Sequence, residues 1–116
     1  MSRHDHRVPL RHMLDYACEA ITMTASHERG DLDMDKKLRY ALTHLVELVG
    51  EAANRVPLEI QAELPGVPWP KVISMRNRLI HGYDFLDYDV LWNTIKKDLP
   101  VLVGLLELAL QKDINT

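Results

Sequence analysis

The sequence predicts an all-α protein, an antiparallel four-helix bundle with a short extra helix between the second and third main helices. Two observations predict this fold. Apolar residues recur at helical spacing along most of the chain, and the alternation of apolar and polar residues that is typical of strands is absent. The 116 residues fit a single domain, residues 1–116, and domains of this size often gain stability by oligomerising.

The first main helix is expected at about residues 8–27. Pro9 is acceptable in a first turn, and the segment "ERGDLD" ends the helix. The apolar positions that follow Pro9 at helical spacing are Leu10, Leu14, Ala17 and Ile21.

The second main helix is expected to open near Asp33, a plausible N-cap. Its apolar stripe consists of Leu38, Leu42, Leu45, Val49, Ala52 and Val56, and Ala41, Leu48 and Ala53 widen it. A stripe of this width suits a helix that is buried on two sides, as in a bundle that also dimerises.

The segment "PLEIQAELPGVPWP" contains four prolines and one glycine, which leaves room for one short helix at 57–63. The third main helix is then expected to start near Trp69, with Pro70 in its first turn. It should end near Gly82, because glycine readily adopts the left-handed conformation that ends helices.

The fourth main helix follows the short loop "YDFLD", and either Asp87 or Asp89 is expected to cap it. Pro100 lies inside this helix. Its missing amide donor and the bulk of its ring predict a kink around residues 96–100.

Composition narrows the functional classes. The formal net charge is -3, so any nucleic-acid contact must come from a local basic patch. The single cysteine, Cys18, suits a reducing compartment, and no signal peptide is apparent in residues 1–13. The longest apolar stretch, 101–110, is too short to span a bilayer. We therefore expect a cytoplasmic protein without a membrane contact.

The stretch "MRNRLIHGY", residues 75–83, contains the residue types best suited to a chemical role. Lys71, Arg76 and Arg78 place three positive charges in the turns before His81, and no acid separates the polar residues of the stretch. The planar fork of arginine binds phosphate oxygens, and histidine, with a free pKa near 6.5, transfers protons. Together these groups could cleave RNA without a metal, and Asn77 could orient either of them.

The spacing raises a geometric problem. Arg76 and His81 are five residues apart, about 140° around a regular helix, whereas Asn77 and His81 share a face. Either His81 leaves the helix at the Gly82 cap, or two chains form a composite site. The alternative is that both arginines are solvated, His81 favours the helix dipole and Tyr83 packs across the cap.

Other polar and aromatic residues have two interpretations each. Glu51 either lines the cleft and accepts a hydrogen bond from Arg76, or is a satisfied polar residue on a mostly buried helix. Trp69 and Trp92 could stack on bases, but we expect them to pack in the core.

The histidines and acids elsewhere in the chain favour structural interpretations. A metal site is conceivable at the N-terminal histidines, but most of that segment precedes the first helix, so we expect no metal; these residues are His4, His6 and His12. The acids that follow the motif oppose RNA electrostatically and are expected to serve as cap and first-turn residues; they are Asp84, Asp87 and Asp89.

The motif resembles the Arg-x4-His-x-Tyr signature of HepT-like toxins in the HEPN superfamily, with Arg76, His81 and Tyr83 at its three positions and Asn77 after the arginine. The segment "LVGEAANRVP" resembles the family's Gly-Glu-Ala segment. The stretch "PWPKVISMRNRLIHGYDFLDYDVLWNTIKKDLP" follows the family order of Trp, basic motif, Asp-rich loop, second Trp and Asp-Leu-Pro.

This resemblance implies a homodimer in which the motifs of both chains line a basic cleft. It implies metal-independent cleavage of RNA, with transfer RNA as one candidate substrate, and no cofactor. It also implies a toxin–antitoxin system, in which an MNT-type nucleotidyltransferase neutralises the toxin by binding it and by transferring AMP to Tyr83. Carried over, Arg76 stabilises the phosphate and the transition state, His81 is the acid/base, and Asn77, Arg78 and Glu51 support them.

Two other functions remain open from the sequence. The chain could be a non-catalytic helical module that recognises a substrate or nucleotide for a partner nucleotidyltransferase. It could also be a plain dimeric scaffold, in which case Arg76 and His81 would lie apart in separate packing environments.

Overall fold

The long helices follow the stretches with the strongest helical periodicity. The structure is a computed structural model, and it describes residues 3–81 and 85–114. Its elements in chain order are α1 (Arg3–Thr24), α2 (Asp31–Met34), α3 (Lys36–Asn54), α4 (Leu58–Glu63), α5 (Trp69–Ile73), α6 (Met75–Leu79), β1 (Ile80–His81), β2 (Phe85–Leu86), α7 (Tyr88–Asn93), the π-helix η1 (Thr94–Asp98) and α8 (Leu99–Ile114).

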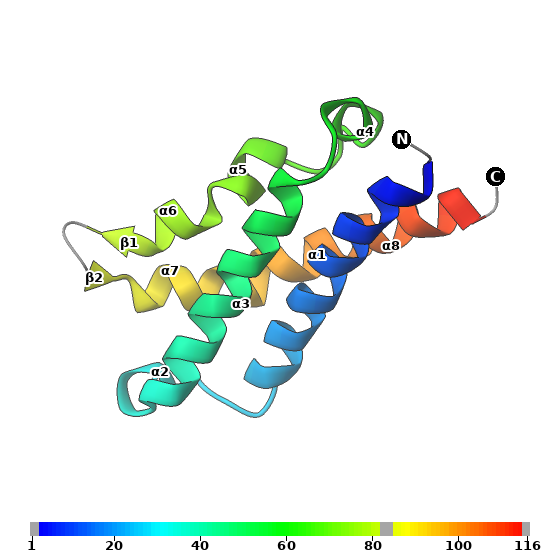
Figure 1. The fold of residues 1–116 in the computed structure, drawn as a ribbon. Coiled ribbons are helices and arrows are strands. Elements are labelled where there is room, and N and C mark those ends of the chain that lie inside the picture. Colours follow the sequence, from blue (N-terminus) through cyan, green and yellow to red (C-terminus); the bar gives the residue numbers. More distant parts are fainter. Residues whose placement is uncertain (1–2, 82–84, 115–116) are drawn as a thin grey trace.

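The core lies where α1 packs against both α3 and α8, and α5 and α6 cover α3 farther along (Figure 1). The inward faces of the three long helices supply its buried side chains, among them Leu10, Met13, Leu42, Val46, Val49, Leu102 and Leu106. The predicted all-α bundle, with its short extra helix α4, is therefore confirmed. No helix in the described part of the chain is long and apolar enough to cross a membrane.

The molecule is elongated, with principal extents of 47 × 30 × 20 Å. The β1–β2 hairpin forms one end, whereas the start of α1 and the end of α8 lie together at the other end (Figure 1). The motif helix α6 leads directly into that hairpin, so the motif is remote from both ends of the chain.

The first helix differs from its predicted range of 8–27. It runs over Arg3–Thr24, so Pro9 lies in the second turn rather than the first. The helix ends because the Thr24 hydroxyl donates to the Ile21 carbonyl, and the next amides, those of Ala25 and His27, bond to carbonyls only three residues back.

The predicted N-cap of the second helix was wrong. Asp33 lies inside the short helix α2, where its carboxylate pairs with Arg29. The cap is instead Asp35, which has an extended backbone and accepts a hydrogen bond of 3.0 Å from the Leu38 amide. Both residues are aspartates near the start of an apolar stripe, so the sequence pattern did not distinguish them.

The third helix also differs from the prediction. Instead of one helix from Trp69 to Gly82, the chain forms α5 and α6, separated at Ser74. The Ser74 hydroxyl donates to the Pro70 carbonyl at 2.7 Å, and the same carbonyl accepts from the Ser74 amide at 3.1 Å. Such a second bond to the carbonyl four residues back often bends a helix. Gly82 lies outside the described residues.

A short pair of antiparallel strands lies at the predicted loop after the motif, whereas no strand was predicted. Ile80 pairs with Leu86 and His81 with Phe85. The Asp87 amide then donates to the Leu79 carbonyl at 2.7 Å, and this bond closes the base of the hairpin.

The fourth helix confirms two predictions. Asp87 caps α7, because its side chain accepts a hydrogen bond from the Val90 amide. The predicted kink is present as the π-helix η1, which ends directly before Leu99 and Pro100. Pro100 has no amide hydrogen to donate, and the wider turn, closed by the Leu99 amide on the Thr94 carbonyl, accommodates its ring.

Candidate active site

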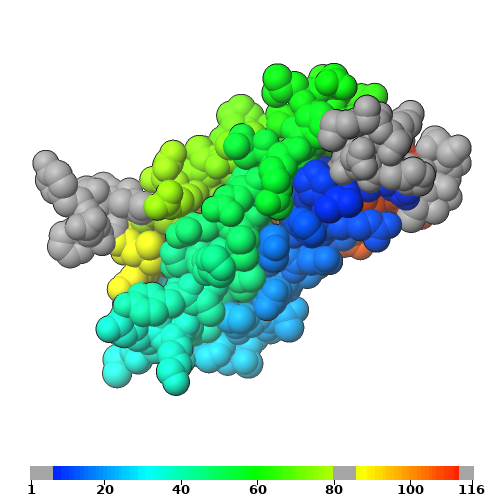
Figure 2. All heavy atoms as spheres, in the orientation of Figure 1, coloured from blue at the N-terminus to red at the C-terminus, as the bar shows by residue number. Residues whose placement is uncertain are grey.

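The motif helix is positioned by a close approach between α5 and α3. A Cβ atom added to Gly50 would lie 3.1 Å from the Val72 carbonyl oxygen and 3.2 Å from that of Ile73. These are backbone atoms and cannot move aside as a flexible side chain can. Glycine at this position of the "GEA" segment therefore lets α5 lie against α3, and α6 follows from α5 along the same face (Figure 2).

Arg76 lies in the first turn of α6 on the side of α3. Its Nε is 3.9 Å from Oε1 of Glu47, a distance longer than a hydrogen bond, and 64% of the side chain is exposed. Glu51, one of whose two predicted roles was as the partner of Arg76, is exposed on α3, and the carboxylate beside Arg76 is that of Glu47. The guanidinium of Arg76 is therefore accessible to an incoming anion.

Arg78 lies on the opposite side of α6, toward η1. Its Nη2 is 3.5 Å from Oδ2 of Asp98, and the Lys71 ammonium is 3.9 Å from Oδ1 of the same carboxylate. Nε and Nη2 of Arg78 are both buried, and neither has a hydrogen-bond partner among the described residues. The two arginines of the motif thus occupy different environments.

His81 does not continue the helix. Because α6 ends at Leu79, the His81 backbone lies in β1 opposite Phe85, so the expected angle of 140° from Arg76 does not apply. The expectation that Asn77 and His81 share one helical face is wrong for the same reason, and the Asn77 side chain is exposed. The His81 side chain and the whole of Tyr83 lie outside the described residues.

The acids that follow the motif are engaged elsewhere, as expected for cap and first-turn residues. Asp87 caps α7, and Asp89, in the first turn of α7, pairs with Arg29. The hydrogen bond to Asp89 is the main reason that the pKa of Arg29 is raised. Asp84 lies outside the described residues.

The two tryptophans contribute to packing. Trp69 is buried, and its indole Nε1 donates to the carbonyls of Gln61 and Leu64, both at 3.0 Å. Trp92 is half-buried against the core, and the Lys96 ammonium lies 5.1 Å from the centre of its ring. The expectation of a packing role is therefore confirmed for Trp69, and the exposed part of Trp92 is partly covered by Lys96.

The histidines near the N-terminus do not form a described metal site. The described residues contain no group of three or more histidine, cysteine, aspartate or glutamate side chains placed to hold an ion. His12 lies beside Tyr16, and its Nδ1 is 3.4 Å from Arg55 Nη2. The side chains of His4 and His6 lie outside the described residues.

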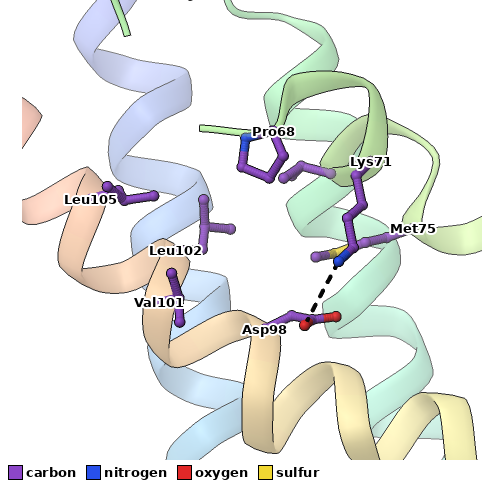
Figure 3. A pocket seen from close by; sticks show the side chains of 8 residues that line it. Pro68, Lys71, Met75, Asp98, Val101, Leu102 and Leu105 are labelled. Atoms are coloured by element: carbon purple, nitrogen blue, oxygen red, sulfur yellow. Dashed lines mark ion pairs between the residues drawn. The ribbon is translucent and has the colours of Figure 1, made fainter. Parts of the chain in front are cut away.

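A small pocket of about 140 Å³ lies beside the motif, between α5 and the start of α8 (Figure 3). Its walls are mostly apolar, and Lys71 and Asp98 are the charged residues among those that line it: Pro68, Lys71, Val72, Met75, Asp98, Val101, Leu102 and Leu105. Arg76 is not among its lining residues, so the pocket is separate from the accessible side of the motif.

Comparison with known proteins agrees with the family resemblance of the sequence. The sequence profile of the family described as Ribonuclease HepT-like matches residues 13–109. The chain belongs to the HepT-like ribonuclease family. The matched range includes Arg76, His81 and Tyr83 of the motif, and also Gly50 and Asp98.

The names of similar proteins agree with the assignment of the chain to the HepT-like ribonuclease family. A protein of Thermococcus cleftensis named "Probable ribonuclease HepT" is 39% identical over 98 residues, which cover 81% of this chain and 89% of the relative. A protein of Methanocaldococcus jannaschii with a provisional RNase name is 33% identical over 100 residues, covering 86% and 92% of the two chains. No solved structure matches the chain significantly.

Two acidic residues beside the motif were missed by sequence reasoning. Glu47 lies one helical turn before Glu51, and a pairing with Arg76 requires the packing of α6 on α3, which the sequence does not reveal. Asp98 stands two residues before Pro100, and the expected kink at that proline was the available signal that its side chain leaves the regular helical path.

Proposed function

We propose that the protein is a metal-independent endoribonuclease with Arg76 and His81 in its cleavage site. The observation that carries the proposal is the geometry of the motif in a HepT-like ribonuclease chain. Arg76 is exposed on α6, and the chain leaves the helix at Leu79, only two residues before His81. His81 is thereby released from the helical angle that would have turned it away from Arg76.

The proposed reaction is a transfer of the phosphoryl group within the RNA. A base takes the proton of a ribose 2′-hydroxyl, the 2′-oxygen attacks the adjacent phosphorus, and the bond to the 5′-oxygen breaks as that oxygen receives a proton. The products are a 2′,3′-cyclic phosphate and a 5′-hydroxyl. His81 carries out one of the proton transfers, and Arg76 offsets the negative charge that develops on the phosphate oxygens.

The charges at the motif favour a homodimer as the active form. Lys71 and Arg78 both lie against Asp98, which leaves Arg76 as the more exposed arginine of the motif, at 64% against 34% for the Arg78 side chain. One accessible arginine gives a weak site for RNA, whereas two copies at a shared cleft double the local positive charge. We therefore propose that the motifs of two chains line one basic cleft.

We further propose that the protein is the toxin of a toxin–antitoxin pair, with an MNT-type nucleotidyltransferase as antitoxin and transfer RNA as a candidate substrate. The antitoxin would bind the toxin and transfer AMP to Tyr83. Attached AMP would add bulk and negative charge two residues from His81, where an RNA phosphate would otherwise bind. The support for this proposal is the match of the motif, including Tyr83, to the HepT pattern.

The test is cleavage of a total transfer RNA pool in excess chelator by purified protein, after its intact mass has excluded AMP on Tyr83. Wild type is compared with His81→Ala and with His12→Ala. His12 is a matched control, because it lies on α1 beside Arg55 at the other end of α3. Wild type and His12→Ala should cleave, and His81→Ala should not.

Two results would contradict the proposal. One is the absence of cleavage by a folded, unmodified wild-type protein both with and without chelator, which would favour a binding module for a partner nucleotidyltransferase. The other is equal cleavage by wild type and His81→Ala, which would remove His81 from the reaction. Loss of cleavage on adding chelator would overturn metal independence alone.

A further inference from the structure

Asp98 occupies an unusual backbone position. It is the last residue of the π-helix η1, in which the wider turn contains one residue more than an α-helical turn would. The insertion changes the direction of the side chains around it by about 100° relative to a continuous α-helix. Leu99 remains fully buried in the core, while Asp98 is turned toward α5 and α6.

The Asp98 carboxylate is shared by two cations from two different helices. Oδ1 lies 3.9 Å from the Lys71 ammonium of α5, and Oδ2 lies 3.5 Å from Arg78 of α6. Lys71 and Asp98 face each other across the rim of the apolar pocket (Figure 3). The Asp98 side chain is 34% exposed, so water partly screens its ion pairs. It also lines the mostly apolar pocket.

The motif helix depends on such contacts for its position. α6 has five residues, and a helix of that length is not stable by itself, so its orientation comes from tertiary contacts. Met75 and Leu79 are buried, and the pairing of Arg78 with Asp98 adds a polar contact on the side opposite Arg76. Fixing that side leaves Arg76 toward α3 and solvent.

We propose that Asp98 is a positioning residue of the cleavage site, which anchors α6 through Arg78 and Lys71 so that Arg76 is presented to RNA. This inference rests on the proposed ribonuclease function. It assigns different roles to the two arginines of one motif: Arg78 holds the helix, and Arg76 contacts the phosphate.

The competing interpretation is that Lys71 and Arg78 contact RNA directly and that Asp98 only weakens their attraction. The two interpretations predict opposite changes in cleavage for Asp98→Asn. The substitution removes one negative charge and releases two cations, so RNA binding should be unchanged or tighter in both cases. The rate of RNA cleavage should fall if Asp98 positions α6. It should rise together with RNA binding if Asp98 only competes with RNA for Lys71 and Arg78.

The experiment compares steady-state cleavage by wild type, Asp98→Asn, Asp98→Glu, Arg78→Ala and the double variant Asp98→Asn with Arg78→Ala. Asp33→Asn is the matched control, because it also removes a carboxylate paired with an arginine, at a site on α2. We expect Asp98→Asn to lower kcat roughly tenfold to a hundredfold without raising KM, as for a misplaced catalytic group. Asp98→Glu should recover part of the loss, and the double variant should be no worse than Arg78→Ala.

Amide hydrogen exchange over residues 75–79, measured without RNA, provides a readout that is independent of activity. Exchange should be faster in Asp98→Asn than in wild type and unchanged in Asp33→Asn. Unchanged exchange, or a kcat that stays equal or rises, would overturn the inference. If wild type itself does not cleave RNA, the proposed function fails, and the exchange result alone decides whether Asp98 anchors α6.

Discussion

The two sides of the motif helix differ more than its sequence suggests. Arg76 and Arg78 are the same residue type two positions apart, about 200° around α6. On one side Arg76 is 64% exposed, with a carboxylate 3.9 Å away. On the other side Arg78 has two buried guanidinium nitrogens and shares Asp98 with Lys71. A cluster of basic residues therefore contains both a residue accessible to substrate and residues that hold the helix.

The largest expected effect is the loss of RNA cleavage when Arg76, on the exposed side of α6, is removed. Arg76→Ala should lower kcat by about 10²–10³-fold, which is the usual cost of removing one group that stabilises developing charge. The free energy of unfolding should change by less than about 0.5 kcal/mol, because the side chain is mostly exposed. Steady-state cleavage measures kcat, and urea unfolding of the same preparation measures the free energy of unfolding. A large loss of stability would mean that Arg76 is structural.

The next effect concerns how α5 and α6 are placed on α3. Gly50→Ala should reduce the free energy of unfolding by about 1–3 kcal/mol, because the new methyl group meets the carbonyls of Val72 and Ile73. Gly104→Ala is the matched control, since a Cβ at that exposed position of α8 meets nothing within 4 Å. It should stabilise the helix by about 0.5–1 kcal/mol. Urea unfolding of the two variants tests the sign as well as the size of this difference.

The N-caps of α3 and α7 are both aspartates, so the same substitution can be compared far from the motif and next to it. Asp35→Ala and Asp87→Ala each remove a side-chain acceptor from a helix N-terminus, at α3 and α7 respectively, and each should cost about 1 kcal/mol. Only Asp87 follows the hairpin that carries His81, so only Asp87→Ala should also slow RNA cleavage. Equal cleavage rates for the two variants at equal stability would show that the start of α7 does not influence the site.

The smallest expected effect is on RNA binding. Glu47 competes with phosphate for Arg76, and Glu47→Gln removes that competition and one negative charge. An exposed ion pair is worth about 0.2–1 kcal/mol, so KM for RNA should fall roughly two- to fivefold. A KM that rises instead would indicate that Glu47 orients Arg76 rather than competes for it.

The spacing of apolar residues and the positions of the prolines predicted the fold well. The apolar stripes indicated the long helices, the four prolines between 57 and 70 indicated the short helix α4, and Pro100 indicated the irregular turn that became η1. These features depend on local chemistry, since a proline lacks its donor wherever it lies. The cap at Asp35 was missed because three aspartates precede α3 within five residues, and packing decides which one accepts the capping bond.

The site was predictable only in part. The residue types of "MRNRLIHGY" indicated phosphate and proton chemistry, but the separation of Arg76 from Arg78 depends on contacts with α3 and η1. The break of the third helix at Ser74 involves a local hydroxyl bond to Pro70, and His81 pairs with Phe85 in a short strand; apolar periodicity indicates neither feature. The regular helical angle between Arg76 and His81 does not apply, because the chain leaves the helix after Leu79, which was the first of the two alternatives drawn from the sequence.

The most direct test of the different roles of the two arginines is the salt dependence of RNA binding. Binding is measured in a His81→Ala background, in which no cleavage is expected, for the parent and for added Arg76→Ala or Arg78→Ala. Arg76→Ala should reduce the slope of log K against log salt by about 0.7, the value for one phosphate contact on a single strand. Arg78→Ala should leave the slope unchanged. Equal reductions, or a reduction with Arg78→Ala alone, would contradict the account.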